Sequence, residues 1–464
     1  MRPLFQLLFF TLLLPSCAVF KSRDTRSALK IKREVARSPI FSKAFTGFTL
    51  LDPATGKTLA DFNGEHYFTP GSNAKILTLA TCLAVLGDSV PGLLHTNYTE
   101  GGETFNYLRP TGDPTFLHPL FKHWQPVFRF LENCYGPTTI DLDNFQDTRF
   151  GPGWAWDDYN EGYSAERSAM PIFGNLMTVK KTNGIWHHFP FDNGDKWGWN
   201  LIREGTIKDL PSTGIPLREE ESNIVYIPPN ETLPEGFTQD IPFRTSAFGL
   251  RDMLRDTTQK SNISTSSTFT KEEENEEKKW IPERLNWRTL YSAPLDTVLR
   301  RMMHQSDNFI AEQMLLVCAG EKFDLLQQDT MIQWMLDSTL STLPQKPRWV
   351  DGSGLSRYNL MTPQSIAQVL LKLWREQPRA QLLSLFPAGG LSGNIQNWYA
   401  GKDGKPYVFA KTGSLGGVQC LSGYVLCRSG KVLAFSFMHN NFVGSSRAWK
   451  VEMQRILEML RDSF

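Results

Sequence analysis

The stretch that most restricts the fold runs from residue 407 to residue 440, close to the end of the chain. Its sequence, YVFAKTGSLGGVQCLSGYVLCRSGKVLAFSFMHN, is rich in β-branched and aromatic residues and carries a turn signal at Ser429-Gly430. This pattern predicts two or three long strands. The stretch from 44 to 72 adds two short strands around a turn at Pro53 to Gly56, followed by a helix that begins at Ser72.

Helices with apolar residues at a spacing of 3.6 are predicted within 294–318 and 363–378, and the chain ends in a further helix over 446–464. Helices and an antiparallel sheet mixed in this order predict an α/β (α+β) core in two segments, 37–87 and 242–464.

The region between these segments, 88–241, is rich in Gly, Pro, Trp, Asn and Asp and has short β-like runs such as NIVYIPP. We expect it to be a β-rich insertion, because it lacks a long helical period. Within the second core segment, residues 258–279 are polar and dense in charge, which is typical of a flexible surface loop.

Charge and hydropathy restrict the class of protein. The 464 residues include 49 basic and 48 acidic side chains, a formal net charge of +1, and no long basic stripe, so nucleic acid is not an expected partner. Beyond the N-terminus no uncharged stretch reaches about 18 residues, and the body of the chain is expected to be soluble.

The N-terminus, MRPLFQLLFFTLLLPSC, has one Arg, an apolar run and Cys17, which is typical of an export signal over residues 1–17. The sequence LPSC also resembles a lipobox, so Cys17 is either a lipidated membrane anchor or part of an ordinary signal peptide. Both interpretations place the protein in the periplasm. Three of the other cysteines are expected to pack as small apolar side chains, whereas a near pair could bond or stay free: Cys82, Cys134 and Cys318 form the first set, and Cys420 and Cys427 the second.

The helix start at Ser72 carries Lys75 one turn later, on the same face. A serine hydroxyl is a weak nucleophile, and an unprotonated lysine within reach can act as its base. The free N–H of Ser72 at the helix start could help to hold an oxyanion. S-x-x-K alone is a weak signal, because Ser is also a favoured helix cap and short patterns recur by chance.

Two further motifs follow in order: Ser306-Asp307-Asn308 and Lys411-Thr412-Gly413. On a strand, Lys411 and Gly413 face one side, and the lysine can attract a carboxylate and lower the pKa of Lys75. Gly413 would let an acyl group approach, and the amide of Ser414 would complete the oxyanion hole. Ser306 could relay a proton, or only cap a helix; Asn308 could bind a peptide amide, and Asp307 is expected to hold its loop.

The three motifs in this order resemble those of serine penicillin-recognising enzymes. The chain is similar to the low-molecular-mass class C penicillin-binding proteins, because the first two motifs are 234 positions apart (306 − 72) and other stretches fit from about residue 37 to the end. These stretches are GDPTF, FGPGWAWDD, DGSGLSRYNLMTP and AKTGSLGGV. The resemblance implies a serine β-lactamase/transpeptidase-like domain with helices around an antiparallel sheet.

The resemblance also implies a two-step acyl transfer on D-alanyl-D-alanine stem peptides of peptidoglycan, with acylation of Ser72 by β-lactam antibiotics, no cofactor and no metal. The expected site comprises the catalytic residues Ser72, Lys75, Ser306, Asn308 and Lys411 and the substrate-binding residues Thr412, Gly413 and Ser414. Endopeptidase action on cross-bridges is a further expectation. A β-lactamase and a penicillin-sensing module without turnover remain alternatives. Asp157 and Asp158 could meet a cationic group of the stem peptide, although an acidic surface turn is the preferred interpretation.

Overall fold

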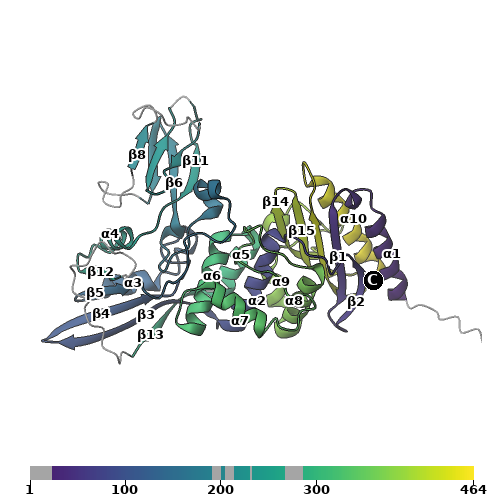
Figure 1. The fold of residues 1–464 in the computed structure, drawn as a ribbon, viewed down its shortest axis with the longest axis horizontal. Coiled ribbons are helices and arrows are strands. Elements are labelled where there is room, and N and C mark those ends of the chain that lie inside the picture. Colours follow the sequence, from purple (N-terminus) through teal and green to yellow (C-terminus); the bar gives the residue numbers. More distant parts are fainter. Residues whose placement is uncertain (1–22, 191–199, 204–213, 230–231, 267–285) are drawn as a thin grey trace, which may run out of the picture.

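The computed structural model describes residues 23–190, 200–203, 214–229, 232–266 and 286–464. The expected export signal over 1–17, with Cys17, lies outside the described residues. Figure 1 shows a helical region in the middle of the molecule, with a sheet and the helices α1 and α10 on one side of it and the strands of the insertion on the other.

The main sheet has five antiparallel strands in the order β14-β15-β16-β1-β2. Strands β1 and β16 pair with Phe48 opposite Phe437, which joins the first segment of the chain to the last. The prediction of two or three long strands near the C-terminus is confirmed, and three are present. The bounds are β1 (Phe45–Asp52), β2 (Lys57–Phe62), β14 (Val408–Leu415), β15 (Val418–Leu426) and β16 (Val432–Asn440).

Both faces of this sheet are covered, because side chains alternate along each strand. Leu50 packs with the apolar side chains of α1 and α10, whereas its neighbour Leu51 packs with those of α2 and α8 on the opposite face. The helical bounds are α1 (Arg23–Arg37), α2 (Lys75–Val85), α5 (Leu295–Gln305), α6 (Asn308–Phe323), α7 (Gln328–Asp337), α8 (Pro363–Glu376), α9 (Arg379–Leu385) and α10 (Arg447–Ser463). The mixed α/β core with an antiparallel sheet is therefore confirmed.

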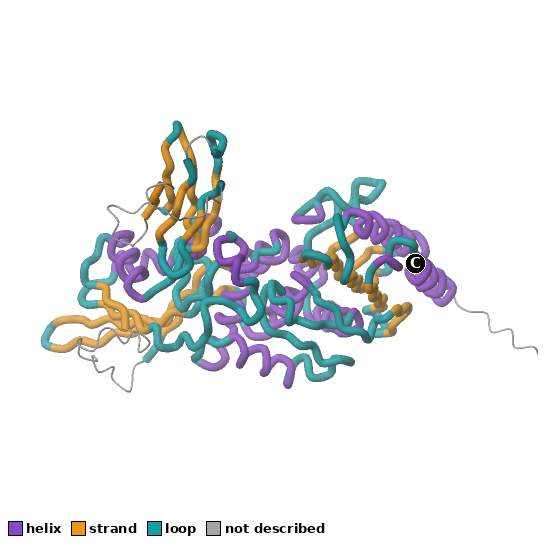
Figure 2. Tube along the Cα trace, turned by 45° about the horizontal axis from the view of Figure 1, so that its top comes forward, coloured by secondary structure: helices purple, strands orange, loops and turns teal. Residues whose placement is uncertain are grey.

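The described part of the inserted region is built around three further sheets, one of five strands and two of three. Figure 2 shows these strands on the far side of the helices from the main sheet. Their strand orders are β12-β5-β4-β3-β13, β11-β6-β7 and β8-β10-β9. Helices α3 (Pro126–Asn133) and α4 (Ala247–Thr258) accompany them. The strand bounds are β3 (Ser89–Glu100), β4 (Glu103–Pro110), β5 (Thr138–Asp141), β6 (Leu176–Thr182), β7 (Ile185–Phe189), β8 (Asn200–Arg203), β9 (Leu217–Arg218), β10 (Ile224–Ile227), β11 (Thr238–Pro242), β12 (Ile263–Ser266) and β13 (Arg288–Pro294).

Strand pairing moves the end of the insertion away from the expected boundary at 241/242. Strand β12 pairs with β5, and β13 pairs with β3, so both belong to the sheet of the insertion. The chain returns to the helical core at Leu295, where α5 begins. Composition could not show this, because pairing between strands so distant along the chain leaves no local pattern. In the expected polar loop 258–279, the strand β12 is described and residues 267–279 lie outside the described residues.

The five cysteines in the described part of the chain are free thiols and all are buried. Cys82, Cys134 and Cys318 are buried as predicted. Cys420 and Cys427 do not bond: Cys420 packs in the cluster that contains α2 and α8, whereas Cys427 packs in the cluster of α1 and α10 on the other side of the sheet. Seven positions separate them (427 − 420), and an odd separation along extended chain places side chains on opposite faces.

Candidate active site

Ser72 lies in a 3₁₀ turn, Gly71–Ala74, that leads directly into α2 at Lys75. The predicted helix start is therefore present, but Ser72 does not cap it: the N-cap positions are Pro70 and Ala74, and neither cap uses a side chain. The hydroxyl of Ser72 is half-buried and receives a hydrogen bond from Lys75 Nζ at 3.0 Å. Because the Ser72 hydroxyl is not used as a helix cap, it can react with a substrate.

Lys75 is fully buried, and its Nζ has three polar neighbours. It lies 2.7 Å from Asn308 Oδ1, 2.7 Å from the backbone oxygen of Ser353 and 3.0 Å from Ser72 Oγ. The orientation of the Asn308 amide follows from its second contact, because its Nδ2 donates to the Tyr163 carbonyl at 3.0 Å.

These contacts fix the direction of the amine lone pair. A neutral amine has two N–H bonds and one lone pair, and the oxygens of Asn308 and Ser353 can only accept hydrogen bonds. When both N–H bonds are donated to them, the lone pair faces the Ser72 hydroxyl. This is the arrangement that a general base for Ser72 requires.

The pKa of Lys75 is lowered from its ordinary value to about 8. Burial disfavours the ammonium and is the main cause, while the carboxylates of Glu312, Asp351 and Asp307 act in the opposite direction. Burial also lowers the pKa of Lys411 well below its ordinary value, and the charge of Lys75 adds to this effect. A lysine with a pKa near 8 is partly neutral at neutral pH.

The second motif stands at the junction of two helices. Ser306 ends α5 in the left-handed conformation, with φ of 60°, and Asn308 is the first residue of α6. The side chain of Asp307 accepts from the Ile310 N–H at 3.1 Å and so caps α6. Asp307 therefore holds this junction, while its two neighbours project toward the lysines.

The third motif lies on β14 beside the Ser72 turn. Lys411 Nζ donates to Ser306 Oγ at 2.8 Å and to the Thr412 carbonyl at 2.9 Å. The side chain of Thr412 points to the opposite face of β14 from Lys411. Its hydroxyl accepts a hydrogen bond from Asn394 Nδ2 at 2.7 Å. Asn394 was not anticipated from the sequence, because an isolated Asn carries no local signal.

Gly413 and Gly71 let β14 approach the 3₁₀ turn closely. A Cβ added to Gly413 would lie 2.1 Å from the Pro70 carbonyl oxygen, so this position needs glycine to pack against the turn. A Cβ on Gly71 would lie 3.0 Å from the Ser414 backbone nitrogen. The backbone amides of Ser72 and Ser414 consequently lie on facing segments, where two N–H groups can hold one oxyanion.

The turn at Ser353 supplies a functional atom that the sequence did not reveal. Its carbonyl receives a hydrogen bond from Lys75, and the turn is held in place by Thr78, whose hydroxyl donates to the Gly352 oxygen at 2.6 Å. Gly354 has φ of 80°, which favours glycine. The run DGSG marks a turn, but which backbone oxygen meets a lysine depends on the tertiary fold.

Asp157 and Asp158 form part of the short 3₁₀ helix Trp156–Asn160, and Asp158 accepts from the Tyr163 hydroxyl at 2.8 Å. Among the described residues, no group of three or more His, Cys, Asp or Glu side chains could hold a metal ion. No helix in that part of the chain has both the length and the apolar composition to cross a membrane.

A family model described as the D-Ala-D-Ala carboxypeptidase 3 (S13) family matches residues 28–186 and 245–461. The chain is 22% identical over 449 residues to D-alanyl-D-alanine carboxypeptidase DacB of Haemophilus influenzae, covering 90% of both chains. It is 26% identical over 456 residues to the D-alanyl-D-alanine carboxypeptidase of Actinomadura sp. strain R39, covering 88% of this chain and 80% of the relative.

A solved structure, penicillin-binding protein 4 of Haemophilus influenzae, superposes with a TM-score of 0.71 at 18% identity. The superposition covers 94% of this chain and 99% of that one, which shows that the two share a fold through the core and the insertion.

Proposed function

Since the chain belongs to the D-Ala-D-Ala carboxypeptidase 3 (S13) family, we propose that Ser72 is the nucleophile that is acylated and Lys75 its general base. The protein is a serine-type D-Ala-D-Ala carboxypeptidase. The observation that carries the assignment of residues is the set of three contacts at Lys75 Nζ, which leaves its lone pair facing Ser72 Oγ.

In the acylation step, Lys75 takes the proton of the Ser72 hydroxyl while Oγ forms a bond to the carbonyl carbon of the substrate. The oxyanion that develops is held by the amides of Ser72 and Ser414. Collapse of this intermediate breaks the carbon–nitrogen bond, and the departing D-alanine amine takes the proton of Ser306. Lys411, whose Nζ donates to Ser306 Oγ at 2.8 Å, returns a proton to Ser306 and in turn takes the one that Lys75 had accepted, which leaves Lys75 neutral for the second step.

In the second step, water replaces the amine. Lys75 takes a proton from the water, hydroxide adds to the ester carbon of the acyl-enzyme, and Ser72 Oγ leaves with the proton that Lys75 returns to it. The free carboxylate of the terminal D-alanine is recognised by the Lys411 charge and by the Thr412 hydroxyl. Asn308, whose oxygen holds Lys75, positions the base.

The same chemistry extends to two related classes of substrate. A β-lactam presents an amide carbonyl to Ser72 and forms a covalent acyl-enzyme by the first step alone, and penicillin-binding protein 4 of Haemophilus influenzae has been solved in complex with a β-lactam. If the leaving amine belongs to a cross-bridge between peptidoglycan stem peptides, the reaction is that of an endopeptidase. Both substrates use the same side chains of this site.

We place the enzyme outside the cytoplasmic membrane, in the periplasm, because residues 1–17 are typical of an export signal and the substrate is a cell-wall peptide. Lipidation of Cys17 would anchor it to a membrane. Mass spectrometry of the N-terminus of the mature protein distinguishes a lipidated Cys17 from an unmodified chain that begins beyond the signal.

Covalent labelling by fluorescent penicillin tests the nucleophile. We expect the wild-type enzyme to be labelled, Ser72→Ala to remain unlabelled, and Ser429→Ala, which alters an exposed turn serine, to be labelled like the wild type. Labelling of Ser72→Ala would refute the assignment. Release of D-alanine from a pentapeptide mimic separates the enzyme from a sensing module, and slow turnover of a chromogenic cephalosporin separates it from a β-lactamase.

A further inference from the structure

The turn that holds Lys75 is itself held by two buried carboxylates. Glu312 Oε1 accepts from the Ser353 N–H at 2.7 Å, and Asp351 Oδ1 accepts from the Gly354 N–H at 2.8 Å. Glu312 follows Asn308 by four positions on α6, so the two side chains lie on one face of that helix. Asn308 contacts the lysine directly, whereas Glu312 contacts it through the Ser353 peptide.

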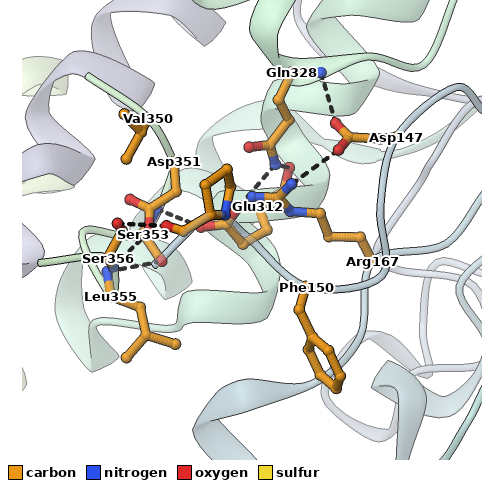
Figure 3. A network of polar contacts seen from close by, with 12 residues as sticks. Asp147, Phe150, Arg167, Glu312, Gln328, Val350, Asp351, Ser353, Leu355 and Ser356 are labelled. Atoms are coloured by element: carbon orange, nitrogen blue, oxygen red, sulfur yellow. Dashed lines mark hydrogen bonds and ion pairs between the residues drawn. The ribbon is translucent and has the colours of Figure 1, made fainter. Parts of the chain in front are cut away.

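Each of these carboxylates has a partner from the insertion, as Figure 3 shows for Glu312. Arg167 Nε and Nη2 lie 3.0 and 2.8 Å from Glu312 Oε2, and both side chains are almost completely buried. Trp154 Nε1 donates to Asp351 Oδ2 at 3.0 Å. Arg167 stacks over the Trp154 ring at 5.5 Å, so the two partners from the insertion also support one another.

The ion pair of Arg167 and Glu312 is also connected to α7, a second helix of the core. Asp147, also from the insertion, accepts from Arg167 Nη1 at 3.0 Å and from the N–H of Gln328, the first residue of α7, at 2.8 Å. The side-chain amide of Gln328 returns to Glu312 Oε2 at 2.8 Å. The insertion is thus connected to α6 and α7 directly behind the catalytic lysine.

We infer that the insertion positions the general base: Arg167 holds Glu312, and Glu312 holds the turn whose carbonyl receives an N–H of Lys75. This inference rests on the proposed role of Lys75. Arg167 and Glu312 are positioning residues, because neither touches the substrate or Ser72.

The same contacts bear on the charge of Lys75. Burial alone would raise the pKa of the Glu312 carboxyl, but Arg167 and the hydrogen bonds from Ser353 and Gln328 more than offset burial and hold that pKa below its ordinary value. Glu312 is therefore an anion close to Lys75, and Arg167 compensates its charge. The charged groups that face the amine come from three elements: Glu312 of α6 with Asp307 at its cap, Asp351 of the turn, and Lys411 of β14.

The two partners must therefore shift the pH dependence of acylation in opposite directions. In Arg167→Met the hydrogen bonds from Ser353 and Gln328 still favour the anion of Glu312, but its charge is no longer compensated. This favours the ammonium of Lys75, so the acidic limb of the acylation profile, where the rate constant rises with pH, moves to higher pH by about one unit. In Glu312→Gln the anion is lost while an oxygen remains to accept from the Ser353 N–H, and the limb moves to lower pH. A loss of packing alone would not move the acidic limb in opposite directions in these two variants.

The experiment measures the rate constant of labelling by fluorescent penicillin between pH 6 and pH 9.5 for the full chain, together with the final labelling stoichiometry. Because a buried ion pair with one partner removed destabilises a protein, the rate constant is taken per site that becomes labelled. Arg167→Met should show a rate constant at pH 7 about tenfold below the wild type. The double variant Arg167→Met/Glu312→Gln should return the limb close to its wild-type position.

Arg109→Met is the matched control, since Arg109 pairs with Asp141 at 2.8 Å within the insertion and does not contact the Ser353 turn. Its rate constant and limb should equal those of the wild type. If the wild type is not labelled at Ser72, the proposed function fails; if it is labelled, an unmoved limb in Glu312→Gln, or shifts of the same sign in both single variants, overturns the positioning role. Glu312→Gln decides the matter even when Arg167→Met does not fold.

Discussion

Lys411 Nζ donates a hydrogen bond to Ser306 Oγ at 2.8 Å, although the two residues are 105 positions apart in the sequence. The contact joins a strand of the main sheet to the junction of α5 and α6. It orients the Ser306 oxygen toward the buried Lys411 amine, which donates to it, so the hydroxyl hydrogen is free to point toward a leaving group. The second and third motifs therefore act as one unit.

Removal of the Ser306 hydroxyl should slow acylation without loss of the fold. Ser306 has φ of 60°, a conformation that glycine adopts without strain, so Ser306→Gly is the cleanest variant. We expect its acylation rate constant to fall by about 10² to 10⁴, the usual contribution of one proton-transfer group. Penicillin labelling measures the rate, and thermal unfolding should show a melting temperature no lower than that of the wild type. An unchanged rate would assign Ser306 a structural role alone.

Acylation should depend on pH through the ionisation of Lys75. The base must be neutral to accept the Ser72 proton, and its pKa is about 8. The rate constant of penicillin labelling should therefore rise by about tenfold per pH unit below that value and level off above it. A profile that is flat between pH 6 and pH 9 would exclude Lys75 as the base whose ionisation limits the reaction.

Asn308→Asp should move this profile, because it places an anion where an amide oxygen now lies 2.7 Å from Lys75 Nζ. A carboxylate this close favours the ammonium and raises the pKa of a lysine by about 1 to 3 units. The acidic limb should shift upward by the same amount. Asn308→Ala removes the acceptor without adding charge, so it should slow acylation and leave the limb without that upward shift; equal limbs in the two variants would contradict the electrostatic account.

Gly413→Ala should separate β14 from the turn that carries Ser72. The new methyl group would lie 2.1 Å from the Pro70 oxygen, a distance that real atoms do not tolerate. We expect labelling by penicillin to be lost or reduced by at least about 10²-fold, with a lower melting temperature. Gly87→Ala is the control, because nothing lies within 4 Å of its added Cβ. Wild-type labelling of Gly413→Ala would show that this packing does not position Ser72.

The sequence predicted the core well where the pattern is local. The alternating strands near the C-terminus and the helical periods of α5, α6 and α8 appear in the structure, because each pattern depends on neighbours within one element. Composition predicts the end of the insertion at 241, whereas strands β12 and β13 continue its five-stranded sheet to Pro294. Pairing between distant strands depends on the path of the chain, which composition does not record.

The residues that the motifs nominated converge on one place: Lys75 contacts both Ser72 and Asn308, and Lys411 contacts Ser306. The motifs did not show which contacts Ser72 and Gly413 make in the fold. Ser72 was a possible helix cap and makes no capping bond, and Gly413 serves the approach of two backbone segments. A charged Glu312 within an apolar helical run was the one sequence signal that a buried partner was needed.

The sequence by itself determined the reactive groups and the family resemblance, because these depend on residue types at short, fixed spacings along one helix turn or one strand. Only the tertiary structure decided how the base is held. The third contact of Lys75 is a backbone oxygen, which every residue type has, and the charge that balances Glu312 comes from Arg167, 145 positions away. A local sequence pattern predicts neither which backbone oxygen meets a lysine nor which distant arginine pairs with a buried carboxylate, so only the tertiary structure identifies both.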